Sequence, residues 1–132
     1  MKPSSILLIA GEPSGDQLAA ELVRALQLQT GPSHPRFFGA GGPAMEAAGV
    51  EILCDLTAHS VIGPADAVRQ LGRFRRAFDG LLEAARERTP DIIIGVDFGA
   101  FNLRFQKAIT AMAQERPGPF HNWRPRRVQF VS

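Results

Sequence analysis

The sequence predicts an α/β protein with a doubly wound parallel sheet, and two observations carry this prediction. The segments Ile6–Ala10 and Asp91–Val96 are almost entirely apolar and have the length of strands that are buried on both faces. Strand-like segments also alternate with helix-like segments along the whole chain, in the order β-α-β-α-β-α-β-α-β. This alternation is typical of a parallel sheet that helices cover on both sides.

The first strand leads into a turn and a helix. Ile6–Ala10 ends at Gly11, and we expect a helix to begin near Gly15, with Ser14 as its N-cap. This helix should end before Gly31. Its apolar residues recur at helical spacing and are Leu18, Leu22, Ala25 and Leu26.

The next segments predict two short strands with a short helix between them. Arg36–Gly39 is the second strand, and a glycine-rich loop follows it. Ala44–Ala48 is a short helix closed by Gly49, and Val50–Cys54 is the third strand.

The second half continues the alternation. After a loop over residues 58–64, Ala65–Arg88 is a long helix that Pro90 ends, because proline cannot continue the hydrogen-bond ladder. Asp91–Val96 is the fourth strand, and Asn102 lies near the start of the next helix. The long helix carries one apolar stripe made of Val68, Leu71, Phe74, Phe78, Leu81 and Leu82.

The last segments are a loop and a strand. Gln114–Pro125 is rich in proline and polar residues, and Val128–Val131 is a fifth strand. Because no segment follows this strand to cover its face, we expect the chain to be the first half of a larger protein. An uncovered face also predicts poor solubility or dimerisation.

The chain has the length and composition of one globular domain. Its 132 residues suffice for a core, and 45% of them are hydrophobic and 21% charged. The formal net charge is only +2, but the arginines cluster in two segments. Such clusters can attract phosphate or an anionic membrane surface. They consist of Arg69, Arg73, Arg75 and Arg76, and of Arg124, Arg126 and Arg127.

Cysteine usage and the N-terminal sequence predict a cytoplasmic protein. The single cysteine, Cys54, excludes an internal disulfide, and its apolar neighbours favour a structural thiol over a nucleophile. Lys2 and Pro3 lead directly into the first strand, so we expect no signal peptide. No apolar segment reaches the length of a transmembrane helix.

The loop after the first strand is a candidate ligand site, because open α/β sheets bind ligands at the carboxyl ends of their strands. Glu12, Ser14 and Asp16 lie there together with amides of the helix start. The loop lacks the three-glycine dinucleotide fingerprint and the lysine of a P-loop. Its groups suit a polyhydroxy ligand or a phosphate. The alternative is an ordinary strand-to-helix turn.

Asp97 is the candidate catalytic residue. It follows an apolar strand, and a carboxylate among apolar neighbours can have a raised pKa and act as a general base. The alternative is that Asp97 caps the next helix. The chain's histidines share no metal-binding spacing, and no serine lies in a nucleophile elbow, so neither a zinc site nor hydrolase chemistry is favoured. These histidines are His34, His59 and His121.

The segment from Val61 to Phe78 mixes apolar residues with four arginines. A basic amphipathic helix can lie at a membrane interface, whereas the alternative is an ordinary surface helix with its apolar side on the sheet. Nucleic-acid binding is disfavoured, because the aromatic residues fit a packing stripe better than a stacking platform. The candidate membrane-surface residues are Val61, Ile62, Arg69, Arg73 and Arg76.

Five collinear segments together resemble the lipid-A-disaccharide synthase family. They are Ala10–Asp16, Phe38–Met45, Val61–Gly63, Gly95–Asn102 and Val128–Ser132. The resemblance covers nearly the whole chain. It implies the N-terminal half of a GT-B fold, with two Rossmann-like domains in the complete enzyme.

The resemblance also implies a reaction. The enzyme would be an inverting glycosyltransferase that joins UDP-2,3-diacylglucosamine to 2,3-diacylglucosamine 1-phosphate, releasing UDP, with no metal or other cofactor. Asp97 would be the general base for the acceptor 6-hydroxyl. Asn102 would orient the loop around Asp97. Glu12, Ser14, Gly15 and Asp16 would shape the acceptor side of the cleft.

Two departures from the family pattern are visible. Many members carry a second aspartate where this chain has Ala100, and the donor-binding second domain lies outside residues 1–132. We therefore expect residues 1–132, as an acceptor-side domain, to bind little UDP-sugar and to be inactive alone. The implied partners are the acylated sugar substrates and the inner-membrane surface, with homodimerisation as a further option. Two alternatives are a flavodoxin-like module that binds a phosphorylated ligand and a lipid-binding protein that retains only the fold.

Overall fold

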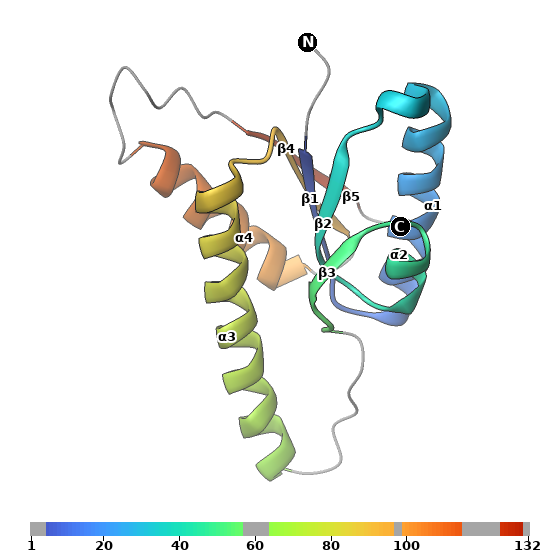
Figure 1. The fold of residues 1–132 in the computed structure, drawn as a ribbon. Coiled ribbons are helices and arrows are strands. Elements are labelled where there is room, and N and C mark those ends of the chain that lie inside the picture. Colours follow the sequence, from blue (N-terminus) through green and yellow to red (C-terminus); the bar gives the residue numbers. More distant parts are fainter. Residues whose placement is uncertain (1–4, 57–63, 97–98, 115–124, 131–132) are drawn as a thin grey trace.

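The structure is a computed structural model that describes residues 5–56, 64–96, 99–114 and 125–130 (Figure 1). Its strands are β1 (Ser5–Ala10), β2 (Arg36–Ala40), β3 (Glu51–Cys54), β4 (Ile92–Val96) and β5 (Arg126–Phe130). Its helices are α1 (Pro13–Thr30), α2 (Pro43–Ala47), α3 (Pro64–Arg88) and α4 (Gly99–Gln114), and a 3₁₀ turn, η1 (Gly31–Ser33), follows α1.

The strands form one parallel sheet in the order β3-β2-β1-β4-β5, which confirms the predicted doubly wound α/β fold. Helices α1 and α2 cover one face of the sheet, and α3 and α4 cover the other (Figure 1). Side chains of β1 alternate between the two faces. Ile6 and Leu8 pack with α1 and α2, whereas Leu7 and Ile9 pack with α3 and α4. An unbroken apolar strand is therefore what this central position requires.

The apolar stripe of α3 packs against the sheet and α4, as predicted where its side chains are described. Phe78 makes edge-to-face contacts with Phe101 and Phe105, with ring centroids 5.4 and 5.6 Å apart. Leu81 is buried in the same cluster. The stripe's first two side chains, those of Val68 and Leu71, lie outside the described residues. The aromatic residues that can be placed therefore serve packing.

The predicted boundaries are correct to within two residues wherever the structure describes the segment. α1 begins at Pro13, two residues before the expected start, and β5 begins at Arg126 instead of Val128, because Arg126 pairs with Ile92 of β4. The strand begins with two arginines, Arg126 and Arg127, which are exposed at the sheet edge, so its first residues lack the apolar character by which a strand is predicted from sequence. The predicted loop over 58–64 and most of Gln114–Pro125 lie outside the described residues.

One arginine at the C-terminal end of α3 contacts strands β2 and β3 of the sheet. Arg88 forms an ion pair with Glu51 of β3, and its guanidinium lies 4.8 Å from the ring centroid of Phe38 in β2. The long amphipathic helix is thus fixed at this end. No helix within the described parts of the chain is long and apolar enough to cross a bilayer.

Candidate functional site

The topological switch point of the sheet lies between β1 and β4. These neighbouring strands are parallel, and the chain continues from β1 to β2 on one side and from β4 to β5 on the other. The start of α1 packs against the carboxyl end of β4, because a Cβ added at Gly15 would lie 3.3 Å from the carbonyl oxygen of Val96. Ligands of open α/β sheets bind at such a position. The structure thus places the first loop beside the strand that precedes Asp97.

The turn after β1 differs in one respect from the prediction. Glu12 occupies the N-cap position with extended backbone, and its side chain makes no capping hydrogen bond. The expected N-cap, Ser14, was wrong: it lies inside α1, because Pro13 is already the first helical residue. Proline suits that position, since its φ is preset and its missing N–H is not needed. Glu12 and Ser14 are exposed at this edge, and Gly15 is buried.

The carboxylate of Asp16, in the first turn of α1, binds the start of α2. Only 4% of the residue is exposed. Oδ1 accepts hydrogen bonds from the N–H groups of Gly42 (3.0 Å) and Met45 (2.9 Å), and Oδ2 accepts one from Ala44 (2.9 Å). These amides belong to the first turn of α2 and the residue before it, so Asp16 serves as the cap that α2 lacks locally. The carboxylate therefore holds the glycine-rich loop against α1.

Asn102 lies in the first turns of α4 and faces β4. It is 1% exposed, and among the described residues neither its Nδ2 nor its Oδ1 has a hydrogen-bond partner. Gln106, one turn further along α4, donates from Nε2 to the Ile93 carbonyl at 3.4 Å. Buried polar atoms are nearly always paired in proteins. An unpaired amide beside the carboxyl end of β4 therefore calls for an explanation other than packing.

Gly95 of β4 makes room for Asn102, which gives a stability prediction. A Cβ at Gly95 would lie 2.6 Å from Cγ of Asn102, which is closer than carbon atoms can approach. Gly95→Ala should therefore lower the free energy of unfolding by about 2 kcal/mol, the usual cost of overpacking a core. Urea unfolding would measure this loss.

Two controls test that explanation of Gly95. Gly72→Ala in α3 should leave stability unchanged or raise it, since a Cβ there meets no atom within 4 Å. Gly95→Ala should cost distinctly less in an Asn102→Gly background, because Cβ of Asn102, which lies 2.9 Å from the added Cβ, is then removed together with Cγ. Equal losses in both backgrounds would show that the side chain of Asn102 is not the obstacle.

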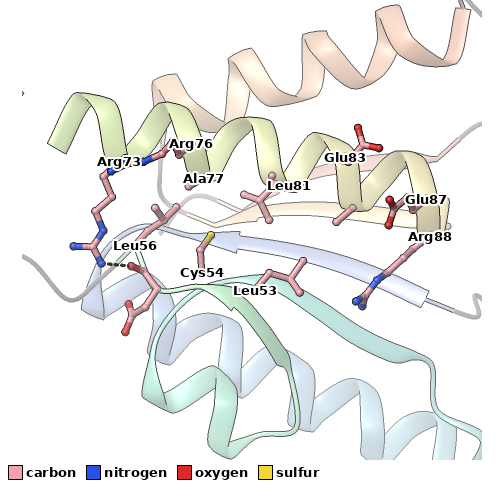
Figure 2. Close-up of a pocket in the computed structure, with 13 residues that line it drawn as sticks. Leu53, Cys54, Leu56, Arg73, Arg76, Ala77, Leu81, Glu83, Glu87 and Arg88 are labelled. Atoms are coloured by element: carbon pink, nitrogen blue, oxygen red, sulfur yellow. Dashed lines mark hydrogen bonds between the residues drawn. The ribbon is translucent and has the colours of Figure 1, made fainter. Parts of the chain in front are cut away.

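A groove of about 570 Å³ lies between β3 and α3, on the sheet face that α3 and α4 cover (Figure 2). Cys54 lies on its floor, half-buried, and burial raises the pKa of its thiol, although the nearby Arg73 guanidinium partly offsets this effect. A raised pKa keeps the thiol protonated, which agrees with the expectation that Cys54 is not a nucleophile. Arg73 Nη2 donates to the Asp55 carbonyl at 2.9 Å.

The candidate membrane-surface residues are only partly placed. Arg73 and Arg76 are exposed on α3 and line the groove. Val61, Ile62 and the side chain of Arg69 lie outside the described residues, and so does Asp97, the predicted general base. The structure thus brings Glu12, Ser14, Gly15, Asp16 and Asn102 to the end of the sheet where β4 leads to Asp97.

Residues 6–117 match the family model described as lipid-A-disaccharide synthetase. The chain belongs to this family. Curated relatives named lipid-A-disaccharide synthase include one from Myxococcus xanthus, 44% identical over 83% of the chain, and one from Pasteurella multocida, 41% identical over 77% of the chain. A further relative with this name, from Rhodospirillum centenum, is 33% identical over the whole chain. The family resemblance predicted from sequence motifs is confirmed.

The chain spans only part of these family members. It corresponds to 28%, 26% and 34% of the lengths of the three relatives. The sequence motifs pointed to residues that lie at the switch point of this sheet, but they did not reveal the groove or the capping role of Asp16. The sequence around Asp16 does not indicate that the backbone N–H groups bonded to its carboxylate belong to residues 26 to 29 positions further along the chain.

Proposed function

We propose that this chain is the N-terminal, acceptor-side domain of a lipid-A-disaccharide synthase, an inverting glycosyltransferase of the GT-B type. The match of residues 6–117 to the family model carries this proposal. The structure adds support, because the residues chosen from sequence as substrate-binding gather at the switch point of the sheet. A binding crevice in an α/β fold is expected at that point.

In the proposed reaction, Asp97 accepts the proton of the 6-hydroxyl of 2,3-diacylglucosamine 1-phosphate. The hydroxyl oxygen then forms a bond to the anomeric carbon of UDP-2,3-diacylglucosamine on the face opposite the leaving group. The bond from that carbon to UDP breaks, and UDP leaves with the electron pair. The product is a β-1,6-linked disaccharide, and the inversion follows from this single displacement. No metal ion is part of the proposal.

The other candidate residues have roles that fit their surroundings. Glu12 and Ser14 are exposed at the edge and would contact the acceptor sugar. Both oxygens of Asp16 already accept backbone hydrogen bonds, so we assign Asp16 a positioning role for the glycine-rich loop. The buried amide of Asn102 would bond to the loop that contains Asp97, which would satisfy its unpaired atoms.

The proposal requires a donor-binding domain from outside residues 1–132. UDP recognition in a two-domain enzyme of this type rests on that second domain, so these residues alone should be inactive. The acyl chains of both substrates would bring the enzyme to the cytoplasmic face of the inner membrane, with the arginine-rich helix α3 toward anionic lipid.

A chimera tests the function. The 132-residue chain would replace the corresponding part of the Myxococcus xanthus relative, to which it is 44% identical over 110 residues. Mass spectrometry would detect the disaccharide made from the two purified substrates. We expect product from the chimera and none from the isolated chain. A chimera that folds and binds UDP but makes no disaccharide, beside an active relative, would overturn the proposal.

A further inference from the structure

The groove between β3 and α3 has an apolar floor. Leu53, Leu56 and Leu81 lie along it, and Leu53 is an exposed large hydrophobic residue, with 39% of its surface accessible (Figure 2). The volume of about 570 Å³ lies in the usual range for small-molecule sites, roughly 300–1,000 Å³. Sites for small molecules are mostly lined by apolar side chains, so the leucines along a cavity of this size favour an apolar ligand.

Small residues of α3 keep the groove open. Ala77, Gly80 and Ala84 line it at intervals of three and four residues, so they share one face of the helix. A Cβ added at Gly80 would meet no atom within 4 Å, so the space beside this glycine can accept a larger side chain. Glycine is also an unfavourable residue in a helix interior. Gly72 of the same helix also has open space around an added Cβ, so what distinguishes Gly80 is its place in the lining of the groove.

The two ends of the groove carry opposite charge. Arg73 and Arg76 lie at the end where β3 finishes (Figure 2), and Arg73 is held there by its hydrogen bond to the Asp55 carbonyl. At the other end, Glu83 and Glu87 accompany Arg88, whose charge is paired with Glu51. A guanidinium has five N–H donors, so the single bond of Arg73 leaves it able to bind phosphate. An amphiphilic anion would therefore lie with its head at the Arg73 end.

We propose that this groove holds one acyl chain of the acylated sugar phosphate acceptor, with the phosphate at Arg73 and Arg76. The identity of the lipid rests on the proposed function, whereas the chemistry, a single hydrocarbon chain with an anionic head, rests on the groove itself. Arg73 lies where β3 ends, at the same edge of the parallel sheet as the carboxyl ends of β1 and β4. The groove thus directs the sugar head toward the switch point and the chain away from it.

The only cysteine of the chain reports occupancy of the groove. The probe is dodecyl phosphate below its critical micelle concentration, and the measurement is the rate at which iodoacetamide alkylates Cys54 at alkaline pH. We expect saturating probe to slow alkylation at least tenfold. Each methylene added to a shorter alkyl phosphate should tighten binding about fourfold. An alkylation rate that dodecyl phosphate does not change would overturn the proposal.

Two glycines of α3 provide a matched pair of variants. Gly80 and Gly72 both lie on this helix with open space around the added Cβ, and only Gly80 lines the groove. By titration calorimetry, Gly80→Trp should weaken dodecyl phosphate binding at least tenfold and Gly72→Trp should leave it unchanged. Equal losses in the two variants would place the ligand elsewhere.

A second pair of ligands tests the arginine end. Replacing Arg73 and Arg76 with glutamine should weaken binding of dodecyl phosphate about tenfold and leave dodecyl maltoside unaffected. Equal weakening of both ligands would refute the assigned direction of the chain.

The groove and the enzymatic function can fail separately. Disaccharide synthesis by the chimera without protection of Cys54 would reject the groove and keep the transferase. Protection of Cys54 by both dodecyl phosphate and the acylated sugar phosphate, in a chimera without transfer activity, would keep the groove and reject the transferase. Protection by dodecyl phosphate and not by the acylated sugar phosphate would reject the assigned occupant.

Discussion

Asp97→Asn in the active chimera should lower kcat by about 10²–10⁴-fold, the range expected when a general base is lost. Asparagine keeps the size and polarity of the side chain but cannot accept the proton of the acceptor hydroxyl. The affinity for the acceptor should change little, because the proposed role of the carboxylate is exercised during the chemical step. Initial rates at saturating substrate and an acceptor titration would separate the two quantities.

The control for this prediction is Asp79→Asn. Asp79 is an exposed aspartate of α3, so its substitution makes the same change in charge at a position remote from the switch point. It should leave kcat unchanged. If Asp97→Asn retained more than a tenth of the activity, another group would have to remove the proton, and the assignment of Asp97 as the base would be wrong.

Asp16→Ala should lower the free energy of unfolding by about 4 kcal/mol. The substitution removes an acceptor carboxylate from three backbone N–H groups, and each hydrogen bond to a charged group contributes about 1.5–3 kcal/mol. The site is buried, so water cannot replace all three bonds without a local rearrangement. Urea unfolding followed by circular dichroism would give the loss directly.

Less drastic substitutions at Asp16 test the same explanation. Asp16→Asn should cost less than Asp16→Ala, because one amide oxygen still accepts, but the NH₂ group would face N–H donors. Asp79→Ala, at an exposed aspartate, should change stability by no more than about 0.5 kcal/mol. A loss below 1 kcal/mol for Asp16→Ala would mean that α2 does not depend on the carboxylate.

The sequence allowed the sheet to be predicted because its central strands are distinctive. β1 and β4 are buried on both faces, and only apolar residues are compatible with that position. The start of β5 could not be predicted in the same way, since Arg126 and Arg127 belong to an edge strand with exposed side chains. The prediction of Ser14 as the N-cap was also wrong, because it rested on the preference of serine for that position, whereas α1 already begins at Pro13.

Those residues of the candidate site that come soon after the end of a strand in the sequence could be predicted. Glu12 and Asn102 could be assigned to the same edge from the order of elements alone. The capping role of Asp16 could not, because it depends on the way α1 and α2 pack together on one face. The groove is formed by residues of β3 and α3, which are far apart in the sequence and share no motif. The structure is therefore needed to show that Cys54 and Gly80 line one cavity.

The carboxylate of Asp16 also has a consequence for protein engineering. Helix α2 has only five residues, too few to be stable alone, and its first amides depend on a side chain of α1. The glycine-rich loop is therefore not an exchangeable module, although it looks like one in the sequence. A graft of residues 41–47 into another member of the family would fold correctly only if the recipient already carried an aspartate in the position of Asp16. Loop design in this domain must begin one helix earlier than the loop.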